Sequence, residues 1–144
     1  MLDLPIVLLD PDLPPPSYAR PGDAGLDLLA REDVLLAAAG GRAVVPTGFS
    51  LAIPHGYAGF VQPRSGLAVK HGVTVLNSPG LIDAGYRGEL RVPLINTDPT
   101  ESYQIRRGDR IAQLVIQRVE ACQIVIVDQL EGEDRGGGFG HTGR

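Results

Sequence analysis

The hydrophobic residues of this sequence occur in short runs, which glycine, proline or charged residues interrupt every few positions. Within some runs apolar and polar residues alternate, as at Leu26, Asp27 and Leu28, which is the pattern of a strand with one buried face. Strands are expected at 6–9, 26–28, 34–36, 44–45, 49–53, 57–61, 73–76, 90–95, 103–105, 110–119 and 124–127. The pattern therefore predicts an all-β barrel or sandwich.

Prolines and glycines refine this prediction. With 19 glycines and 12 prolines the chain turns often and does not favour long helices. Pro46 and Pro54 are expected to keep the strands around them short, and Pro93 indicates an edge strand or a bulge. Only 63–72 is expected to form one or two helical turns, ended by Gly72.

The chain of 144 residues suits one domain, which we place at 1–130. The glycine-rich segment 131–144 cannot bury a core, so we expect a flexible C-terminal arm. The sequence shows neither an internal repeat nor a second domain.

Charge and cysteine content exclude several classes of function. The net charge is −4 and there is no basic run, so nucleic acid is not an expected partner. The single cysteine, Cys122, excludes an internal disulfide and a thiolate metal cage, which indicates a reducing compartment. The N-terminus lacks the basic residues of a signal peptide, and no apolar run approaches the ~18 residues of a membrane span. We therefore expect a soluble, cytoplasmic protein without a membrane partner.

The stretch Asn77–Glu89 reads as a tight hairpin with a turn at Pro79-Gly80. Its glycines leave bare backbone that a flat ligand could approach closely. An amide (Asn77), a carboxylate (Asp83) and an aromatic ring (Tyr86) lie within ten residues of one another. The alternative is a surface hairpin whose polar residues only form the turns.

A second candidate site is Arg64-Ser65-Gly66, where a guanidinium, a hydroxyl and a backbone N–H follow one another at the start of the expected helix. Such donors favour an anion. The alternative is a helix cap by Ser65 beside a solvated arginine. Gln113 is a polar residue inside an apolar strand, so its amide needs a partner, either another loop or a ligand.

The tail adds Arg135, Phe139 and Thr142 among glycines, a composition suited to wrapping phosphate and stacking on a base, or to a disordered end. The carboxylates singled out are Asp27 and Asp83, although solvated surface acids are the usual case. The three histidines have no metal-ligand spacing, so a divalent ion is expected to arrive with a phosphate ligand. Together these features describe a nucleotide site.

Five ordered stretches resemble the motifs of the trimeric dUTP pyrophosphatases (deoxyuridine triphosphate nucleotidohydrolases). They are Ala24–Leu28, Pro63–Ala68, Asn77–Glu89, Arg107–Leu114 and Arg135–Gly143. The resemblance implies a jelly-roll-like distorted β-barrel and a homotrimer whose sites are shared between subunits. It also implies hydrolysis of dUTP to dUMP and pyrophosphate with Mg²⁺, which keeps uracil out of DNA and supplies dUMP for dTMP synthesis.

The same resemblance assigns roles to matching positions. Asp83 is implied as the general base, Asp27 as a water-mediated Mg²⁺ ligand, and Tyr86 as the ring that packs under deoxyribose and excludes a 2′-hydroxyl. The other implied substrate contacts are Asn77, Leu81 and Ile82 at the uracil; Arg64, Ser65, Gly66 and Gln113 at the phosphates; Arg91 near the substrate; and Arg135, Phe139 and Thr142 in a closing lid.

One departure from the family pattern lies in the tail, where Arg135 and Phe139 are one residue closer together and His141 replaces the common serine. A dCTP deaminase on the same fold is the nearest alternative, but it would need a catalytic glutamate in the hairpin region and no Tyr86 or Phe139. A non-enzymatic nucleotide-sensing module is the other alternative, and Asp83 together with the lid argues against it.

Overall fold

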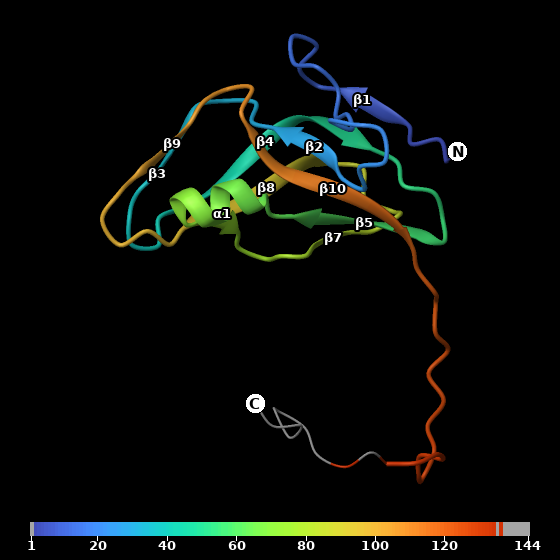
Figure 1. Ribbon diagram of the computed structural model, residues 1–144. Coiled ribbons are helices and arrows are strands. Elements are labelled where there is room, and N and C mark those ends of the chain that lie inside the picture. Colours follow the sequence, from blue (N-terminus) through green and yellow to red (C-terminus); the bar gives the residue numbers. More distant parts are fainter. Residues whose placement is uncertain (1, 135, 137–144) are drawn as a thin grey trace.

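Two four-stranded sheets and one two-stranded sheet, all antiparallel, make up the domain in the computed structural model (Figure 1). The structure describes residues 2–134 and 136. The first sheet has the order β1 (Ile6–Leu8), β4 (Arg42–Leu51), β8 (Glu89–Asn96) and β6 (Val73–Val75). The second has the order β2 (Leu26–Leu29), β10 (Arg110–Arg118), β5 (Tyr57–Gln62) and β7 (Gly80–Ile82), and β3 (Val34–Leu36) pairs with β9 (Tyr103–Ile105). The predicted all-β class is confirmed.

The core joins all three sheets, because strands of each contribute to one cluster of buried side chains. In β8 burial alternates strictly, so Leu90, Val92 and Leu94 face inward. Leu114 of β10 and Leu36 of β3 are also fully buried in the cluster. Each such side chain stabilises the fold by about 1.5–3 kcal/mol relative to an exposed one.

Two predictions about proline are wrong. Strand β4 continues through Pro46, and the chain accommodates the residues that follow with a shift of register between Pro46 and Ser50. Strand β8 continues through Pro93 and lies inside its sheet, between β4 and β6. Its pairing with β6 covers only Leu94–Asn96, so the ladder ends beside the residue that lacks an N–H.

A charged network closes the irregularity of β4. Gly48 has φ +79° there, and its N–H donates to the Glu89 carboxylate at 3.0 Å. Arg31 links this carboxylate to Asp10, at 3.2 and 3.4 Å. Arg107 donates two hydrogen bonds to Asp10 and thereby lowers the pKa of that carboxyl from its ordinary value of 3.8 to about 2. The network ties the start of β8 to the loop after β1, the loop after β2 and the loop before β10.

The single helix of the described residues, α1 (Ser65–His71), has the predicted position. It ends at Gly72, whose left-handed backbone (φ +63°) lets its N–H bond back to the last turn, as the sequence predicted. Arg64, not Ser65, occupies the N-cap position, and no side chain caps the helix. The alternative role of Ser65 as a helix cap is therefore wrong.

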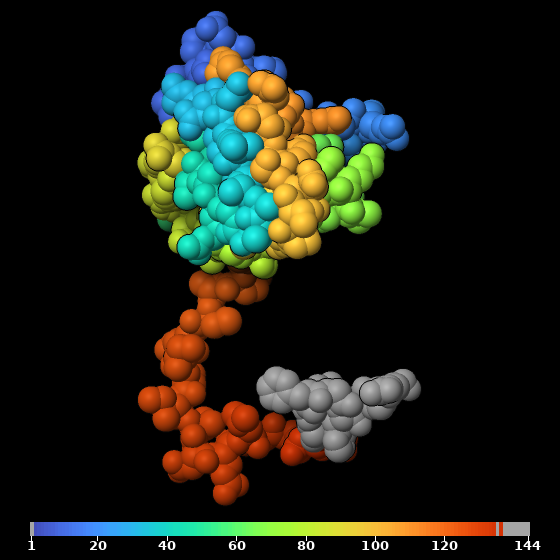
Figure 2. Space-filling model, turned by 90° about the vertical axis from the view of Figure 1, so that its left-hand side faces the viewer, coloured from blue at the N-terminus to red at the C-terminus, as the bar shows by residue number. Residues whose placement is uncertain are grey.

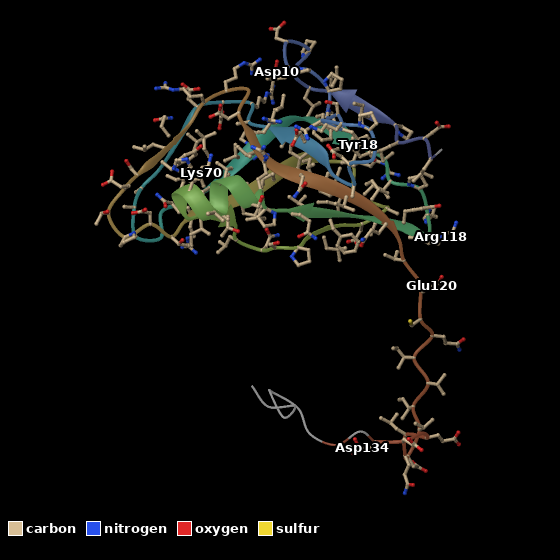
Figure 3. The ribbon with its side chains drawn as sticks, viewed as in Figure 1. Asp10, Tyr18, Lys70, Arg118, Glu120 and Asp134 are labelled. Atoms are coloured by element: carbon tan, nitrogen blue, oxygen red, sulfur yellow. The ribbon has the colours of Figure 1, made fainter. Side chains whose placement is uncertain are left out.

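The predicted last strand at 124–127 is absent. Strand β10 ends at Arg118, and the chain from Glu120 to Asp134 runs away from the domain, as the labelled ends show in Figure 3 and the space-filling view in Figure 2. Ile124, Ile126 and Leu130 are 84%, 94% and 92% exposed. A β-branched run forms a strand only beside another strand, and this segment has no neighbour among the described residues.

None of the helices among the residues that the structure describes is long and apolar enough to cross a membrane.

Candidate active site

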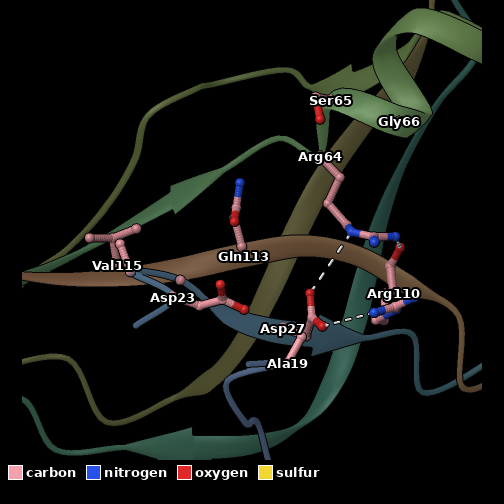
Figure 4. A pocket seen from close by; sticks show the side chains of 11 residues that line it. Ala19, Asp23, Asp27, Arg64, Ser65, Gly66, Arg110, Gln113 and Val115 are labelled. Carbon is pink, nitrogen blue, oxygen red and sulfur yellow. Dashed lines mark hydrogen bonds and ion pairs between the residues drawn. The ribbon is translucent and has the colours of Figure 1, made fainter. Parts of the chain in front are cut away.

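A cleft of about 420 Å³ opens between the start of α1, strand β10 and the segment that leads into β2 (Figure 4). It is lined by Ala19, Asp23, Ala24, Gly25, Asp27, Arg64, Ser65, Gly66, Arg110, Gln113 and Val115. Three of the five predicted motifs meet here. Residues far apart in the sequence come together because β2 and β5 both pair with β10, which places Gln113 opposite Asp27 on one side and Gln62 on the other.

Charge in the cleft is concentrated around Asp27. Its carboxylate lies 3.3 Å from Nη1 of Arg110 and 3.9 Å from Nε of Arg64, as the dashed lines in Figure 4 show. Arg64 also donates through Nη1 to the Arg110 carbonyl at 3.0 Å. Two guanidinium groups thus converge on one carboxylate, which leaves donor capacity for an anionic ligand.

The hydroxyl of Ser65 and the backbone of Gly66 are exposed where α1 begins. A β-carbon at Gly66 would have no atom within 4 Å, so the backbone there is open to a ligand. The first N–H groups of a helix have no partner within the helix. This end of the cleft therefore offers neutral donors beside the two cations.

Gln113 fixes the two walls of the cleft relative to each other. Its Nε2 donates to the Pro63 carbonyl at 3.0 Å, directly before the Arg64-Ser65-Gly66 segment. On the other side, a β-carbon at Gly25 would lie only 2.7 Å from its Oε1. The partner that the sequence required for this amide is thus another loop, and that loop is the one with the anion-binding donors.

The stretch Asn77–Glu89 is not the tight hairpin that the sequence predicted. Its strand β7 pairs with β5 in the second sheet, whereas β8 pairs with β4 and β6 in the first. The stretch crosses from one sheet to the other, with a turn closed by the bond from the Tyr86 N–H to the Asp83 carbonyl. The expected pairing is wrong because the partners of both strands are distant in sequence.

The residues of this stretch that are expected to contact uracil and deoxyribose lie near one another, but outside the cleft. A β-carbon at Gly80 would lie 3.5 Å from Nδ2 of Asn77, Leu81 is 58% exposed, and Ile82 packs against the core. Asp83 and Tyr86 follow and are exposed. Strand β7 is the outermost strand of its sheet, and β5 separates it from β10, so within one chain these residues do not line the cleft.

The remaining predicted site residues have other positions. Arg91 is exposed on β8, 3.3 Å from the Glu89 carboxylate, and does not line the cleft. Arg135, Phe139 and Thr142 lie outside the described residues.

Sequence reasoning missed two charged residues of the cleft. Arg110 lies in the motif Arg107–Leu114, which predicts no role for it, yet its guanidinium donates to the Asp27 carboxylate. Asp23 brings a second carboxylate to the cleft. Its spacing of three residues from Gln113 gave no signal, because side chains alternate faces along a regular strand, and the irregularity between Arg110 and Ala112 is not visible in the sequence.

The fold and the cleft define a class of protein: an antiparallel jelly-roll-type β domain with a polar cleft in which two arginines converge on one carboxylate. The protein-family model for dUTPase matches residues 12–143 of this chain. The chain therefore belongs to the dUTPase family, a family of dUTP diphosphatases, which confirms the family and the enzyme class that the motifs predicted.

Relatives and solved structures agree. The deoxyuridine 5'-triphosphate nucleotidohydrolase of Thermobifida fusca is 63% identical over 94% of this chain and 75% of its own. That of Streptomyces griseus is 57% identical over 99% and 81%. A variant of the dUTPase of Staphylococcus bacteriophage 80alpha with dUpNHpp superposes with a TM-score of 0.90 at 29% identity, over 99% of both chains. A dUTPase of phage phi11 of S. aureus, described with a structural Mg(II) ion, has a TM-score of 0.84 at 28% identity, over 91% of this chain and 100% of its own.

Proposed function

We propose that this protein hydrolyses dUTP to dUMP and pyrophosphate with Mg²⁺, as a homotrimer in the cytoplasm. The observation that carries the proposal is the cleft in which Arg64, Arg110, Ser65 and Gln113 surround Asp27, in a chain of the dUTPase family. Hydrolysis of dUTP would keep uracil out of DNA and supply dUMP for dTMP synthesis.

The cleft is assigned to the triphosphate. Arg64 and Arg110 supply charge-assisted donors, and Ser65 and Gly66 supply a hydroxyl and a backbone N–H. Gln113 holds the loop that carries these donors and lies beside the phosphates. Fixed donors around a transferred phosphoryl group stabilise the charge that spreads over its oxygens in the transition state.

The donor set of the cleft fits Mg²⁺ that arrives with the nucleotide. Among residues 2–134 and 136, no group of three His, Cys, Asp or Glu side chains could hold a metal ion by itself. The Asp27 carboxylate supplies oxygen in the cleft, and Mg²⁺ commonly keeps several waters while binding one or two carboxylates and substrate phosphates. Bound in this way through a water on Asp27, the ion would neutralise phosphate charge.

The stretch Asn77–Glu89 is assigned to the nucleoside and the attacking water. Asp83 would orient a water molecule and take its proton as the water attacks phosphorus and pyrophosphate leaves. Asn77 and nearby backbone would read the edge of uracil, with Leu81 and Ile82 lining the same pocket. A cytosine there would leave polar groups unpaired, which is the strong form of discrimination.

Two observations support assembly. Asp83 and the phosphate cleft lie on opposite sides of β5 in one chain, so a second copy is needed to bring the two halves of the site together. In addition, Ile124, Val125, Ile126, Val127 and Leu130 are each more than half exposed. Apolar surface of this kind marks a protein interface.

Arg91 stays a predicted contact near the substrate, and Arg135, Phe139 and Thr142 stay predicted lid residues.

The test is release of pyrophosphate by the purified protein with Mg²⁺, measured with dUTP, dCTP, dTTP and UTP in parallel. We expect turnover of dUTP alone, and loss of turnover when Mg²⁺ is removed by a chelator. Release of ammonia from dCTP would refute the proposal in favour of a deaminase on the same fold. Binding of dUTP without turnover would favour a nucleotide-sensing module.

A further inference from the structure

The ring of Tyr86 is held against its own chain. Its hydroxyl donates to the Glu89 carbonyl at 2.8 Å. A β-carbon at Gly88 would lie 2.6 Å from that hydroxyl oxygen, 2.9 Å from Cζ and 3.2 Å from Cε2. These separations are shorter than van der Waals contact, so the ring occupies space that only a glycine at position 88 leaves open.

Glu89, the residue that accepts the tyrosine hydrogen bond, is itself fixed to the domain. Its side chain is only 11% exposed. The carboxylate accepts the Gly48 N–H at 3.0 Å and pairs with Arg31 at 3.2 Å and with Arg91 at 3.3 Å. The tip of an otherwise exposed ring is therefore bonded to a residue that three contacts hold in place.

The backbone that carries the ring is fixed from the other side. The Tyr86 N–H donates to the Asp83 carbonyl at 3.0 Å, which closes the turn between the two residues. Arg87 donates through Nη1 to the carbonyls of Ala84 and Tyr86, at 2.6 and 2.7 Å. The position of the ring is thus set at its backbone and at its hydroxyl.

We propose that Gly88 and Glu89 are positioning residues, which fix the plane of the Tyr86 ring and thereby set the preference for deoxyribose over ribose. This inference rests on the proposed function, in which Tyr86 packs under the sugar. Rejecting a 2′-hydroxyl by lack of room requires a wall that does not yield. A 42% exposed tyrosine without these two contacts would yield by changing its side-chain torsions.

The experiment measures kcat/KM for dUTP and for UTP and compares their ratio between variants. In Gly88→Ala the new methyl group displaces the ring and breaks its bond to Glu89. Shape alone rejects an added hydroxyl by only about 10²-fold, so we expect the dUTP:UTP ratio to fall by about tenfold or more. Gly85→Ala is the matched control, because a β-carbon at Gly85 has no atom within 4 Å, and its ratio should not change.

Tyr86→Phe keeps the ring and removes only the hydrogen bond to Glu89, so its ratio should fall less than that of Gly88→Ala. If Gly88→Ala does not fold, Tyr86→Phe still tests whether the hydrogen bond to Glu89 sets the ratio. If thermal unfolding shows that Gly88→Ala is folded, an unchanged dUTP:UTP ratio in this variant would overturn the role of Gly88. An unchanged ratio in Tyr86→Phe would overturn the role of Glu89.

Tyr86→Ala separates this inference from the proposed function. If Tyr86→Ala lowers the ratio and Gly88→Ala does not, the inference fails while the role of Tyr86 stands. If Tyr86→Ala leaves the ratio unchanged, the sugar contact of Tyr86 is refuted and the inference fails with it. Failure of the unaltered protein to hydrolyse dUTP would instead refute the proposed function.

Discussion

Replacing Ile126 by aspartate is expected to dissociate the proposed trimer. Ile126 is 94% exposed in the single chain, so nearly its whole side chain is available for burial against another subunit. Full burial of an isoleucine side chain is worth about 1.5–3 kcal/mol. In a symmetric trimer the contact occurs three times, so the substitution removes about 4.5–9 kcal/mol per assembly, before the cost of burying a carboxylate.

This loss has a measurable size. Because about 1.4 kcal/mol is tenfold in an equilibrium constant, the dissociation constant of the trimer should rise by roughly 10³–10⁶-fold. For three chains in equilibrium with one trimer, the concentration of half-dissociation varies as the square root of this constant. It should therefore rise by roughly 30- to 1,000-fold.

The assay is light scattering on a dilution series after size-exclusion chromatography, with dUTP turnover measured on the same fractions. Ile126→Val, which keeps an apolar β-branched side chain at the same position, is the control and should remain trimeric. Turnover should fall together with the trimer, because one chain does not join Asp83 to the cleft. A trimeric Ile126→Asp variant with an unchanged dilution profile would refute burial of this segment in the assembly.

Three further predictions concern single side chains, and a fourth concerns the C-terminal segment. Asp83→Asn should keep dUTP affinity and lower kcat by about 10²–10⁴-fold, and normal release of pyrophosphate would remove Asp83 as the base. Asp10, whose pKa is lowered to about 2 by its arginine partner, stabilises the fold above its unfolded pKa. That contribution is lost as the pH falls from ~4 to ~2, so Asp10→Asn should flatten the pH dependence of the free energy of unfolding in this window, measured by urea titration. Gln113→Ala should leave the part-buried Pro63 carbonyl without its protein partner and cost about 0.5–1.5 kcal/mol in urea unfolding, with a raised KM for dUTP; an unchanged KM would contradict its role in placing the phosphate loop. Deleting residues 135–144 should leave the size of the assembly unchanged and strongly lower the turnover of dUTP. Unchanged kinetics of dUTP hydrolysis would show that this segment is not a lid.

Local patterns predicted most strands because alternation and turn residues act over a few positions. The strands at Leu26–Leu29, Tyr57–Gln62 and Arg110–Arg118, and the helix that ends before Gly72, follow from such signals. The prediction of a strand at 124–127 is wrong because a high β propensity does not supply the neighbouring strand that the segment would need to pair with.

The pairing of strands that are distant in the sequence could not be predicted from local patterns. The turn residues of Asn77–Glu89 predicted a hairpin, but the hydrogen bonds of β7 and β8 go to β5 and β4, which lie in different sheets. For the same reason the motifs predicted that Asp27, Arg64 and Gln113 belong to one site, but not that Arg110 pairs with Asp27. That contact depends on the register between β2 and β10, which no local pattern sets.

The pairing of Asp27 with two arginines also has a consequence for the rate of ligand capture. The chain carries a net charge of −4, and within the cleft Asp23 and Asp27 offset the charges of Arg64 and Arg110. A polyanion therefore meets little attraction beyond a Debye length of about 8 Å at physiological ionic strength. With the proposed function, selection would take place at contact, where each guanidinium would exchange a carboxylate for a phosphate, and the association rate should depend only weakly on salt.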